Sequence, residues 1–247
     1  MSRALIIIPT YNEIENIERL VVQVRAASTP ETSFDVLVVD DASPDGTGLA
    51  VAALARQDPH VRLLARPAKL GLGTAYLAGF RQALAGNYDC AGTMDADFSH
   101  DPRHLPAMAQ AMDAGADLVV GSRYVSGGGI RNWGIHRHIL SGTANYLARL
   151  AGGLRPHDCT SGYRLYRVAF LRQLDLDEIV SHGYSCLMEL LYVCQTAGAR
   201  IAESPIVFVD RRAGQSKISR REIATAFRTL YDLWRRRRSK PDAKNQS

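Results

Sequence analysis

Two aspartates with a single residue between them, Asp95 and Asp97, stand in the string MDADFSH directly after an apolar run. In an extended segment, side chains two apart point to the same face, so both carboxylates can approach one cation or its ligands. Hard oxygen ligands suit Mg²⁺ or Mn²⁺, which usually also hold substrate phosphates. Two solvated turn acids would look the same in sequence, and the position after a strand is what favours a metal site.

A second acidic pair, Asp40 and Asp41, ends another apolar run in the string VVDDASPDGT. Unpaired carboxylates are costly at the end of a buried strand. We therefore expect Asp41 to bind a ligand, such as a ribose hydroxyl or a base edge. Asp45 and Thr47 are expected mainly to cap the helix that follows.

Two further loops follow apolar runs. The string PTYNE (9–13) offers a stacking ring at Tyr11 and an acceptor at Glu13. The string GLGTA (71–75) resembles a dinucleotide-binding turn but lacks its third glycine, so we interpret it as a tight turn that opens a helix.

The elements that must position these loops alternate between apolar and amphipathic segments. This alternation predicts an α/β fold with a mainly parallel sheet covered by helices, in which ligands bind beyond the carboxyl ends of the strands. Asn12 and Glu15 are expected to cap the first helix, which begins near Ile14. Strands are expected at 4–8, 34–39, 61–64, 88–94, 117–121, 163–167 and 200–207, and further helices at 50–55, 71–85, 135–150, 184–198 and about 219–236.

Composition limits the class of protein. The chain has 247 residues, 46% hydrophobic and 22% charged, which excludes a wholly disordered chain. No apolar run approaches the ~18–20 residues of a spanning helix, and the run at 4–8 is too short for a secretory signal. Four cysteines without CxxC spacing indicate free thiols in a reducing, cytoplasmic compartment. We expect one domain over 1–238, with a nucleotide-binding half at about 1–124, an acceptor and membrane-facing part at about 125–238, and a disordered tail at 239–247.

The loop strings occur in one order along the chain: PTYNE, VVDDASPDGT, KLGLGTAY, MDADFSH and GSRY. Together they resemble glycosyltransferases of family 2. The later strings TSGYRLYR, SHGYSCLMEL and FVDRRAGQSK are similar to the dolichyl-phosphate (polyprenyl-phosphate) mannose synthases of that family. The resemblance covers about residues 4–230. It implies a glycosyltransferase-A (Rossmann-like) fold and inverting transfer of mannose from GDP-mannose to a polyprenyl phosphate, giving a β-linked product.

The resemblance also implies roles for individual residues. The guanine nucleoside pocket would be lined by Pro9, Tyr11, Glu13, Val39 and Asp41. Asp95, Ala96 and Asp97 would meet ribose, metal and diphosphate, with Asp97 the main ligand of Mg²⁺ or Mn²⁺, assisted by Asp95 and Ser99. The catalytic set would be Asp97, Arg123, Arg211 and Lys217, the last three binding phosphates, with a lid at 213–216 that closes as Lys217 engages.

The implied chemistry needs no strong general base, because the attacking phosphate is already ionised near pH 7. A divalent cation and Arg or Lys side chains would stabilise the departing GDP. Glu189, an acid within an apolar helix, is more simply a structural hydrogen-bond acceptor or an acceptor-site contact than a base.

Arg137, in a basic group with Arg131, His136 and His138, is the best candidate for the acceptor phosphate, and a solvated face is the alternative. For Arg164 and Arg167, structural ion pairs and phosphate binding stand as equal alternatives.

The positive charge is concentrated at the carboxyl end. Residues 210–247 hold 12 basic and 4 acidic residues. The last predicted helix carries Ile223, Phe227, Leu230, Tyr231 and Trp234 on one face, with arginines around it. Such a helix is typical of peripheral attachment to an anionic membrane surface, here the cytoplasmic face. The alternatives are packing on the protein's own core or docking on a separate membrane-anchor subunit.

Competing functions remain. A polyprenyl-phosphate glucosyltransferase, or a related enzyme with another nucleotide sugar, would use the same chemistry. A non-enzymatic nucleotide-binding module is less well supported, and nucleic acid is not expected as a partner, because the basic segment lacks interleaved aromatic residues.

Overall fold

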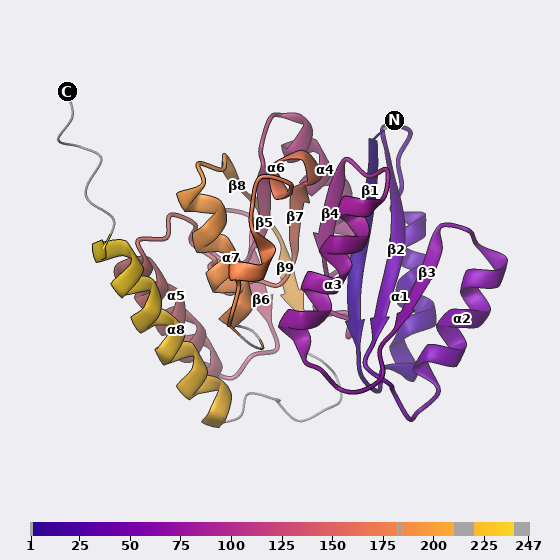
Figure 1. The fold of residues 1–247 in the computed structure, drawn as a ribbon, viewed down its shortest axis with the longest axis horizontal. Coiled ribbons are helices and arrows are strands. Elements are labelled where there is room, and N and C mark those ends of the chain that lie inside the picture. Colours follow the sequence, from indigo (N-terminus) through magenta and orange to yellow (C-terminus); the bar gives the residue numbers. More distant parts are fainter. Residues whose placement is uncertain (1, 182, 184, 210–219, 240–247) are drawn as a thin grey trace.

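The computed structural model describes residues 2–181, 183, 185–209 and 220–239, with side chains in the last range from 225 to 238 (Figure 1). A seven-stranded sheet has the order β3-β2-β1-β4-β7-β5-β8. Every neighbouring pair is parallel except those of β7, which runs antiparallel to β4 and β5. The expected mainly parallel sheet is therefore confirmed. Its strands are β1 (Ser2–Thr10), β2 (Thr32–Asp40), β3 (Val61–Ala65), β4 (Cys90–Thr93), β5 (Leu118–Ser122), β7 (Arg164–Arg167) and β8 (Ile201–Pro205).

Helices cover both faces of this sheet (Figure 1). The strand expected at 200–207 is in fact two strands, because β9 (Val207–Val209) leaves the main sheet and pairs with β6 (Gly129–Arg131). The helices are α1 (Ile14–Ala26), α2 (Thr47–Gln57), α3 (Leu72–Ala85), α4 (Leu105–Asp113), α5 (Ile135–Gly152), α6 (Val168–Leu171), α7 (Ser185–Thr196) and α8 (Arg220–Ser239), with short 3₁₀ turns at Pro102–His104 and Leu176–Glu178.

The apolar run of β1 is continuous because both of its faces are buried. Leu5 and Ile7 belong to a cluster with residues of α3 and α7. Ile6 and Ile8 belong to a second cluster with residues of α1 and α4. A central strand of a parallel sheet with helices on both faces has this pattern.

The carboxyl ends of β1 to β5 lie at one edge of the sheet, the lower edge in Figure 1. Because β7 is antiparallel, its amino end meets the same edge. The loops that follow Thr10, Asp40, Thr93 and Ser122, and the loop that precedes Arg164, therefore converge there.

Helices α5 and α8 pack against each other at the opposite end of the molecule from α2 (Figure 1). Helix α8 reaches Ser239, one residue into the segment expected to be disordered. Within the described part of the chain, no helix has the length and apolar character needed to cross a membrane.

Close packing of α3 on β1 depends on Gly79. A Cβ at this position would overlap Ile7 Cγ2 and lie 2.8 Å from Ile7 Cγ1. We predict that Gly79→Ala lowers the free energy of unfolding by about 1–3 kcal/mol, because α3 must move off the strand. Urea denaturation monitored by circular dichroism measures this change.

Gly142→Ala in α5 is the matched control, since a Cβ there meets nothing within 4 Å. It should raise stability by up to about 1 kcal/mol through helix propensity. Equal effects of the two substitutions would contradict the packing account.

Candidate active site

The acidic pair lies just beyond β4, in a turn that is fixed from several sides. The Tyr76 hydroxyl donates to Asp95 Oδ1 at 3.1 Å, and the Ser99 N–H donates to Asp97 Oδ1 at 3.0 Å. Ala96 between them is buried. The Asp95 side chain keeps 22% of its surface exposed, so the pair is held in place while still open to a ligand.

His100 is a site residue that the sequence analysis missed. Its ring is buried, stacked on Tyr163 at 5.0 Å between centroids and edge-on to Phe208 at 5.6 Å. Burial lowers the pKa of His100 against the opposing charges of Asp95 and Asp97. The neutral ring accepts the Asp95 N–H at Nδ1, over 3.0 Å. His100 thus fixes the backbone of the first aspartate, and its place in MDADFSH was the available signal.

The donor chemistry of this turn fits a divalent cation that is shared with a ligand. No group of three or more His, Cys, Asp or Glu side chains suited to a metal occurs among the described residues. Mg²⁺ and similar ions are often held by one or two carboxylates together with substrate phosphates. Asp97 with Asp95 would supply such a half-site, and the buried Ser99 adjoins it.

Arg123, after β5, forms a buried ion pair with Asp158. Its Nε and Nη2 each donate to the Asp158 carboxylate at 2.7 Å, and its backbone N–H donates to the same group at 3.0 Å. Nη2 also donates to the Thr160 hydroxyl at 2.7 Å. The Asp158 side chain has 0% exposure. The predicted phosphate ligand Arg123 is therefore already oriented and charge-balanced by an aspartate that the sequence analysis did not single out.

The loop that carries Asp158 also reaches the acidic pair. The Thr93 hydroxyl donates to the Gly162 carbonyl at 2.7 Å. A Cβ on Gly162 would lie 3.4 Å from His100 Cε1 and 3.5 Å from Asp95 Oδ1. Gly162 thus lies at ordinary packing distance from the acidic pair, and the two loops form one wall of the site.

At the other end of the edge, Asp40 and Asp41 hold neighbouring loops. Asp40 accepts hydrogen bonds from the Thr10 hydroxyl and from Ser43. Asp41 pairs with Arg66 and accepts the N–H groups of Leu70 and Gly71, each at 3.1 Å. The carboxylate that we expected to bind a ligand thus organises the KLGLG loop in this structure.

The string SPDGT holds the PTYNE loop. The N–H groups of residues 12, 13 and 14 donate to Ser43, Thr47 and Asp45 at 3.0–3.1 Å. Burial would raise the pKa of Asp45, but hydrogen bonds from Thr47 and Ile14 outweigh it and lower that pKa. The expected cap of α1 by Asn12 and Glu15 is wrong, because Asp45 from the next loop caps that helix.

The other predicted nucleoside residues differ in accessibility. Pro9, Tyr11 and Glu13 are half-buried, and the Lys69 ammonium lies 3.9 Å from the centre of the Tyr11 ring. Val39 has 0% exposure and belongs to the core, so its side chain has no exposed surface for a ligand.

Backbone strain is concentrated at this edge. Of the four described non-glycine residues with left-handed φ, Asn12, Ala42 and Phe98 follow β1, β2 and β4. Such conformations are unfavourable and often occur where a ligand site requires a particular loop shape.

The remaining predicted phosphate ligands are Arg137, Arg211 and Lys217. Arg211, Lys217 and the lid at 213–216 are outside the described residues. Arg137, in the first turns of α5, packs its guanidinium over the Trp133 ring at 4.4 Å. Arg131, His136 and His138 are exposed.

Arg164, Arg167 and Glu189 have structural partners. Arg164 is fully buried and donates to the carbonyls of residues 159, 161 and 187, so phosphate binding is not open to it. Arg167 donates to two carbonyls and lies 3.7 Å from Asp117. Glu189 accepts the N–H groups of residues 180 and 181 and pairs with Arg236 of α8 at 2.9 Å. The structural interpretation of Glu189 is confirmed.

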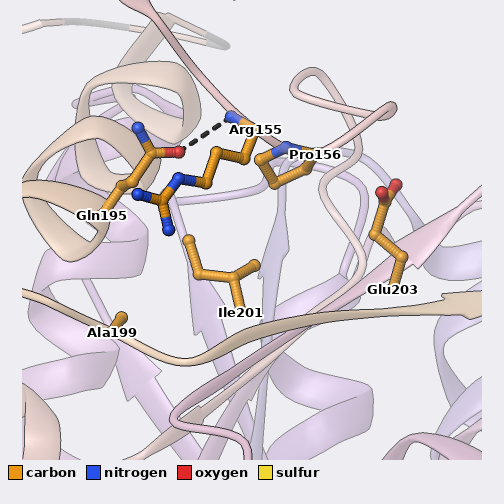
Figure 2. Close-up of a pocket in the computed structure, with 6 residues that line it drawn as sticks. All are labelled: Arg155, Pro156, Gln195, Ala199, Ile201 and Glu203. Atoms are coloured by element: carbon orange, nitrogen blue, oxygen red, sulfur yellow. Dashed lines mark hydrogen bonds between the residues drawn. The ribbon is translucent and has the colours of Figure 1, made fainter.

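A pocket of about 160 Å³ lies between the loop after α5, the end of α7 and β8. Figure 2 shows the residues that line it. Gln195 accepts the Arg155 N–H at 2.8 Å. Glu203 accepts the N–H groups of His157 and Asp158 at 2.8 and 3.1 Å. These polar groups fix the backbone that carries Asp158. The side chains that line the pocket therefore help to hold the buried ion pair in place.

Comparison with known proteins identifies the family of this chain. A profile described as glycosyl transferase family 2 matches residues 5–175. The chain is 46% identical over 227 residues to a polyprenol monophosphomannose synthase of Mycolicibacterium smegmatis, covering 92% of this chain and 84% of the relative. It is 48% identical over 217 residues to an undecaprenyl-phosphate mannosyltransferase of Micrococcus luteus, covering 88% of each.

Solved structures show the same fold. A glucosyl-3-phosphoglycerate synthase of Mycobacterium tuberculosis, in complex with Mn²⁺, UDP-glucose and phosphoglyceric acid, matches with a TM-score of 0.66 at 20% identity. The match covers 98% of this chain and 82% of that one. The expected glycosyltransferase-A fold is confirmed.

Breaking the buried ion pair of Arg123 and Asp158 should lower the free energy of unfolding far more than breaking an exposed pair. We predict that Asp158→Ala lowers the free energy of unfolding by about 3–5 kcal/mol, because it leaves Arg123 buried without a counter-charge. Asp177→Ala removes an exposed pair with Arg81 and should cost no more than about 1 kcal/mol. Urea denaturation of both variants measures the difference.

The stability difference between wild type and Asp158→Ala should depend on pH. Burial alone would raise the pKa of Asp158, but Arg123 outweighs it and holds the pKa below the ordinary value of 3.8. The pair therefore stabilises the fold above that pH, and its contribution is lost as pH falls through the folded pKa. The gap between wild type and Asp158→Ala should narrow below about pH 4, and a constant gap would contradict the ion-pair account.

Proposed function

Because this chain belongs to glycosyl transferase family 2, we propose that it transfers mannose from GDP-mannose to a polyprenyl phosphate. The observation that carries the proposal is the acidic pair, Asp95 and Asp97, fixed but open at the carboxyl edge of the sheet. The M. smegmatis and M. luteus relatives, whose names specify mannose and a polyprenyl phosphate, support the choice of sugar and acceptor.

The donor lies along the first four strands in this proposal. The guanine nucleoside contacts Pro9, Tyr11 and Glu13, with Asp41 shaping the neighbouring loop. The diphosphate reaches the acidic pair, where Asp97 with Asp95 and Ser99 would hold Mg²⁺ or Mn²⁺. Such an ion supplies positive charge to the departing diphosphate.

The acceptor supplies its own nucleophile. A phosphate monoester is ionised near neutral pH, so no residue needs to remove a proton before attack. Attack from the face opposite the diphosphate inverts the anomeric carbon and gives a β-linked product. Arg123, Arg137, Arg211 and Lys217 stabilise the phosphates, with Lys217 closing the lid at 213–216.

The two parts of the chain divide this work. We assign the nucleotide to about residues 1–124 and the acceptor and membrane to about residues 125–238. The buried pair of Arg123 and Asp158 joins the two parts at the site.

Membrane attachment is proposed on the basis of α5 and α8. Helix α8 packs inward through Leu230 and Leu233, while Phe227, Tyr231 and Trp234 remain 60%, 57% and 39% exposed. The predicted single apolar face is thus two faces, one in the core and one outside. We define the α5–α8 apolar surface as Ile135, Ile139, Leu140, Tyr146, Leu150, Phe227, Tyr231 and Trp234, all exposed.

The charge near this surface suits an anionic bilayer. Arg149, Arg228, Arg235 and Arg238 are exposed on the same two helices. Aromatic and basic side chains together are typical of attachment to anionic lipid at the cytoplasmic face. We therefore propose peripheral attachment to the bilayer itself, with a separate anchor subunit as the alternative outcome of the test.

The transfer is tested with labelled GDP-mannose, a polyprenyl phosphate and Mn²⁺ or Mg²⁺. We predict label in an organic-soluble, mild-acid-labile product, and loss of at least about 100-fold in kcat for Asp97→Ala, because the charge on the departing diphosphate is no longer balanced. Asp177→Ala, which removes a carboxylate from an exposed pair, should retain activity. Turnover with UDP-glucose but not with GDP-mannose would contradict the donor.

Membrane docking is tested by flotation with vesicles containing phosphatidylglycerol. We predict that Phe227→Ser combined with Tyr231→Ser and Trp234→Ser abolishes flotation, because the exposed aromatic stripe of α8 is lost. Val22→Ser with Leu49→Ser removes exposed apolar side chains on α1 and α2 and should float normally.

Fluorescence gives a second readout of docking. The chain has two tryptophans, so Trp133→Phe leaves Trp234 as the single indole, and its emission should shift to the blue on these vesicles. Equal flotation of both multiple variants would contradict the docking surface. Binding to cell membranes but not to protein-free vesicles would indicate that the protein docks on a separate anchor subunit and not on the bilayer itself.

A further inference from the structure

Trp133 lies in the loop between β6 and α5, at the centre of a cluster of cations and rings. The guanidinium carbons of Arg137 and Arg123 lie 4.4 and 5.4 Å from the centre of a Trp133 ring. Phe208 and His138 contact it at 5.4 and 5.5 Å between ring centres. A cation over an indole face is attracted by its π electrons, most strongly of the three aromatic side chains. Trp133 therefore helps to set where the Arg137 guanidinium sits.

The indole N–H of Trp133 is buried and has no hydrogen-bond acceptor among the described residues. A buried tryptophan normally finds such a partner, because an unpaired donor away from water costs free energy. Of its neighbours, the guanidinium groups carry donors alone and the Phe208 ring offers no lone pair. The His138 ring can accept through a nitrogen, but it makes no hydrogen bond to this N–H in the structure. What this N–H lacks is a hydrogen-bond acceptor, and an anionic oxygen placed beside the neighbouring guanidinium groups would supply one.

The position of the cluster favours the acceptor over the donor. The donor diphosphate is assigned to Asp95 and Asp97, which follow β4. Trp133 instead directly precedes α5, whose exposed apolar stripe begins at Ile135 and continues through Ile139, 80% and 64% exposed. A phosphate beside Trp133 would leave its attached isoprenyl chain next to that stripe.

Resting on the proposed function, we propose that Trp133 belongs to the acceptor subsite. Its indole N–H donates to an oxygen of the phosphate monoester, and its ring positions Arg137 for the same phosphate. Sequence spacing gave no signal for this role, which appears only when Trp133, Arg137 and Arg123 are seen together.

A fluorescence titration tests the subsite without relying on turnover. Trp234→Phe leaves Trp133 as the single indole of the chain. A water-soluble, short-chain isoprenyl phosphate should produce a saturable change in its emission, inorganic phosphate a weaker one, and GDP none. Arg137→Gln in the same background should weaken binding of the isoprenyl phosphate by about ten- to a hundredfold, the range of a lost hydrogen bond to a charged group.

Kinetics of the full chain provide the second test. Trp133→Phe keeps a ring but loses the N–H, and Trp133→Leu loses both. We predict that KM for the isoprenyl phosphate rises about threefold or more in Trp133→Phe and further in Trp133→Leu, while KM for GDP-mannose is unchanged. A purely structural role would change both KM values together or lower the melting temperature instead.

The outcomes separate the two proposals. An emission change with GDP alone, or none with saturating isoprenyl phosphate in an active enzyme, overturns the acceptor subsite and leaves the proposed function standing. Equal affinity for inorganic phosphate and isoprenyl phosphate overturns the claim that the phosphate bound here carries an isoprenyl chain. A clear emission change in a protein that transfers no mannose supports the subsite and overturns the proposed function.

Discussion

Repulsion between like charges is the constraint on which this site depends. Asp95 and Asp97 cannot turn away from an incoming diphosphate, because Tyr76, His100 and the Ser99 N–H hold their turn. Arg123 brings little net charge, since Asp158 balances it. In the proposed reaction, further positive charge would therefore come with the substrate as a divalent cation, or from the predicted phosphate ligands Arg137, Arg211 and Lys217. This is the physical reason that the proposed reaction couples donor binding to metal binding.

One antiparallel strand makes this arrangement possible. In a wholly parallel sheet, the residues before β7 would lie at the far edge. Because β7 is reversed, the loop with Asp158 and Gly162 meets the loops after β4 and β5. The fold thus joins the part to which we assign the nucleotide to the part that carries Trp133 and the α5–α8 apolar surface.

The sequence predicted most strands and the acidic pair, because apolar runs and motif spacing are local signals. It did not predict contacts between distant residues. Asp45 caps a helix 31 residues away, and Asp158 binds Arg123 across 35 residues. Periodicity alone also predicted a single apolar face for α8. Only tertiary packing decides that Leu233 is buried while Tyr231 is exposed. The role of Trp133 is equally a matter of three-dimensional neighbours.

Binding of GDP with and without a divalent cation tests the central claim most directly. Isothermal titration calorimetry of the wild-type chain should show GDP affinity at least about tenfold higher in Mn²⁺ than in EDTA, a difference of about 1.4 kcal/mol. The gain should vanish in Asp97→Ala. If GDP binds equally well in chelator, or if Asp97→Ala keeps the full gain, the charge-compensation account of this site is wrong.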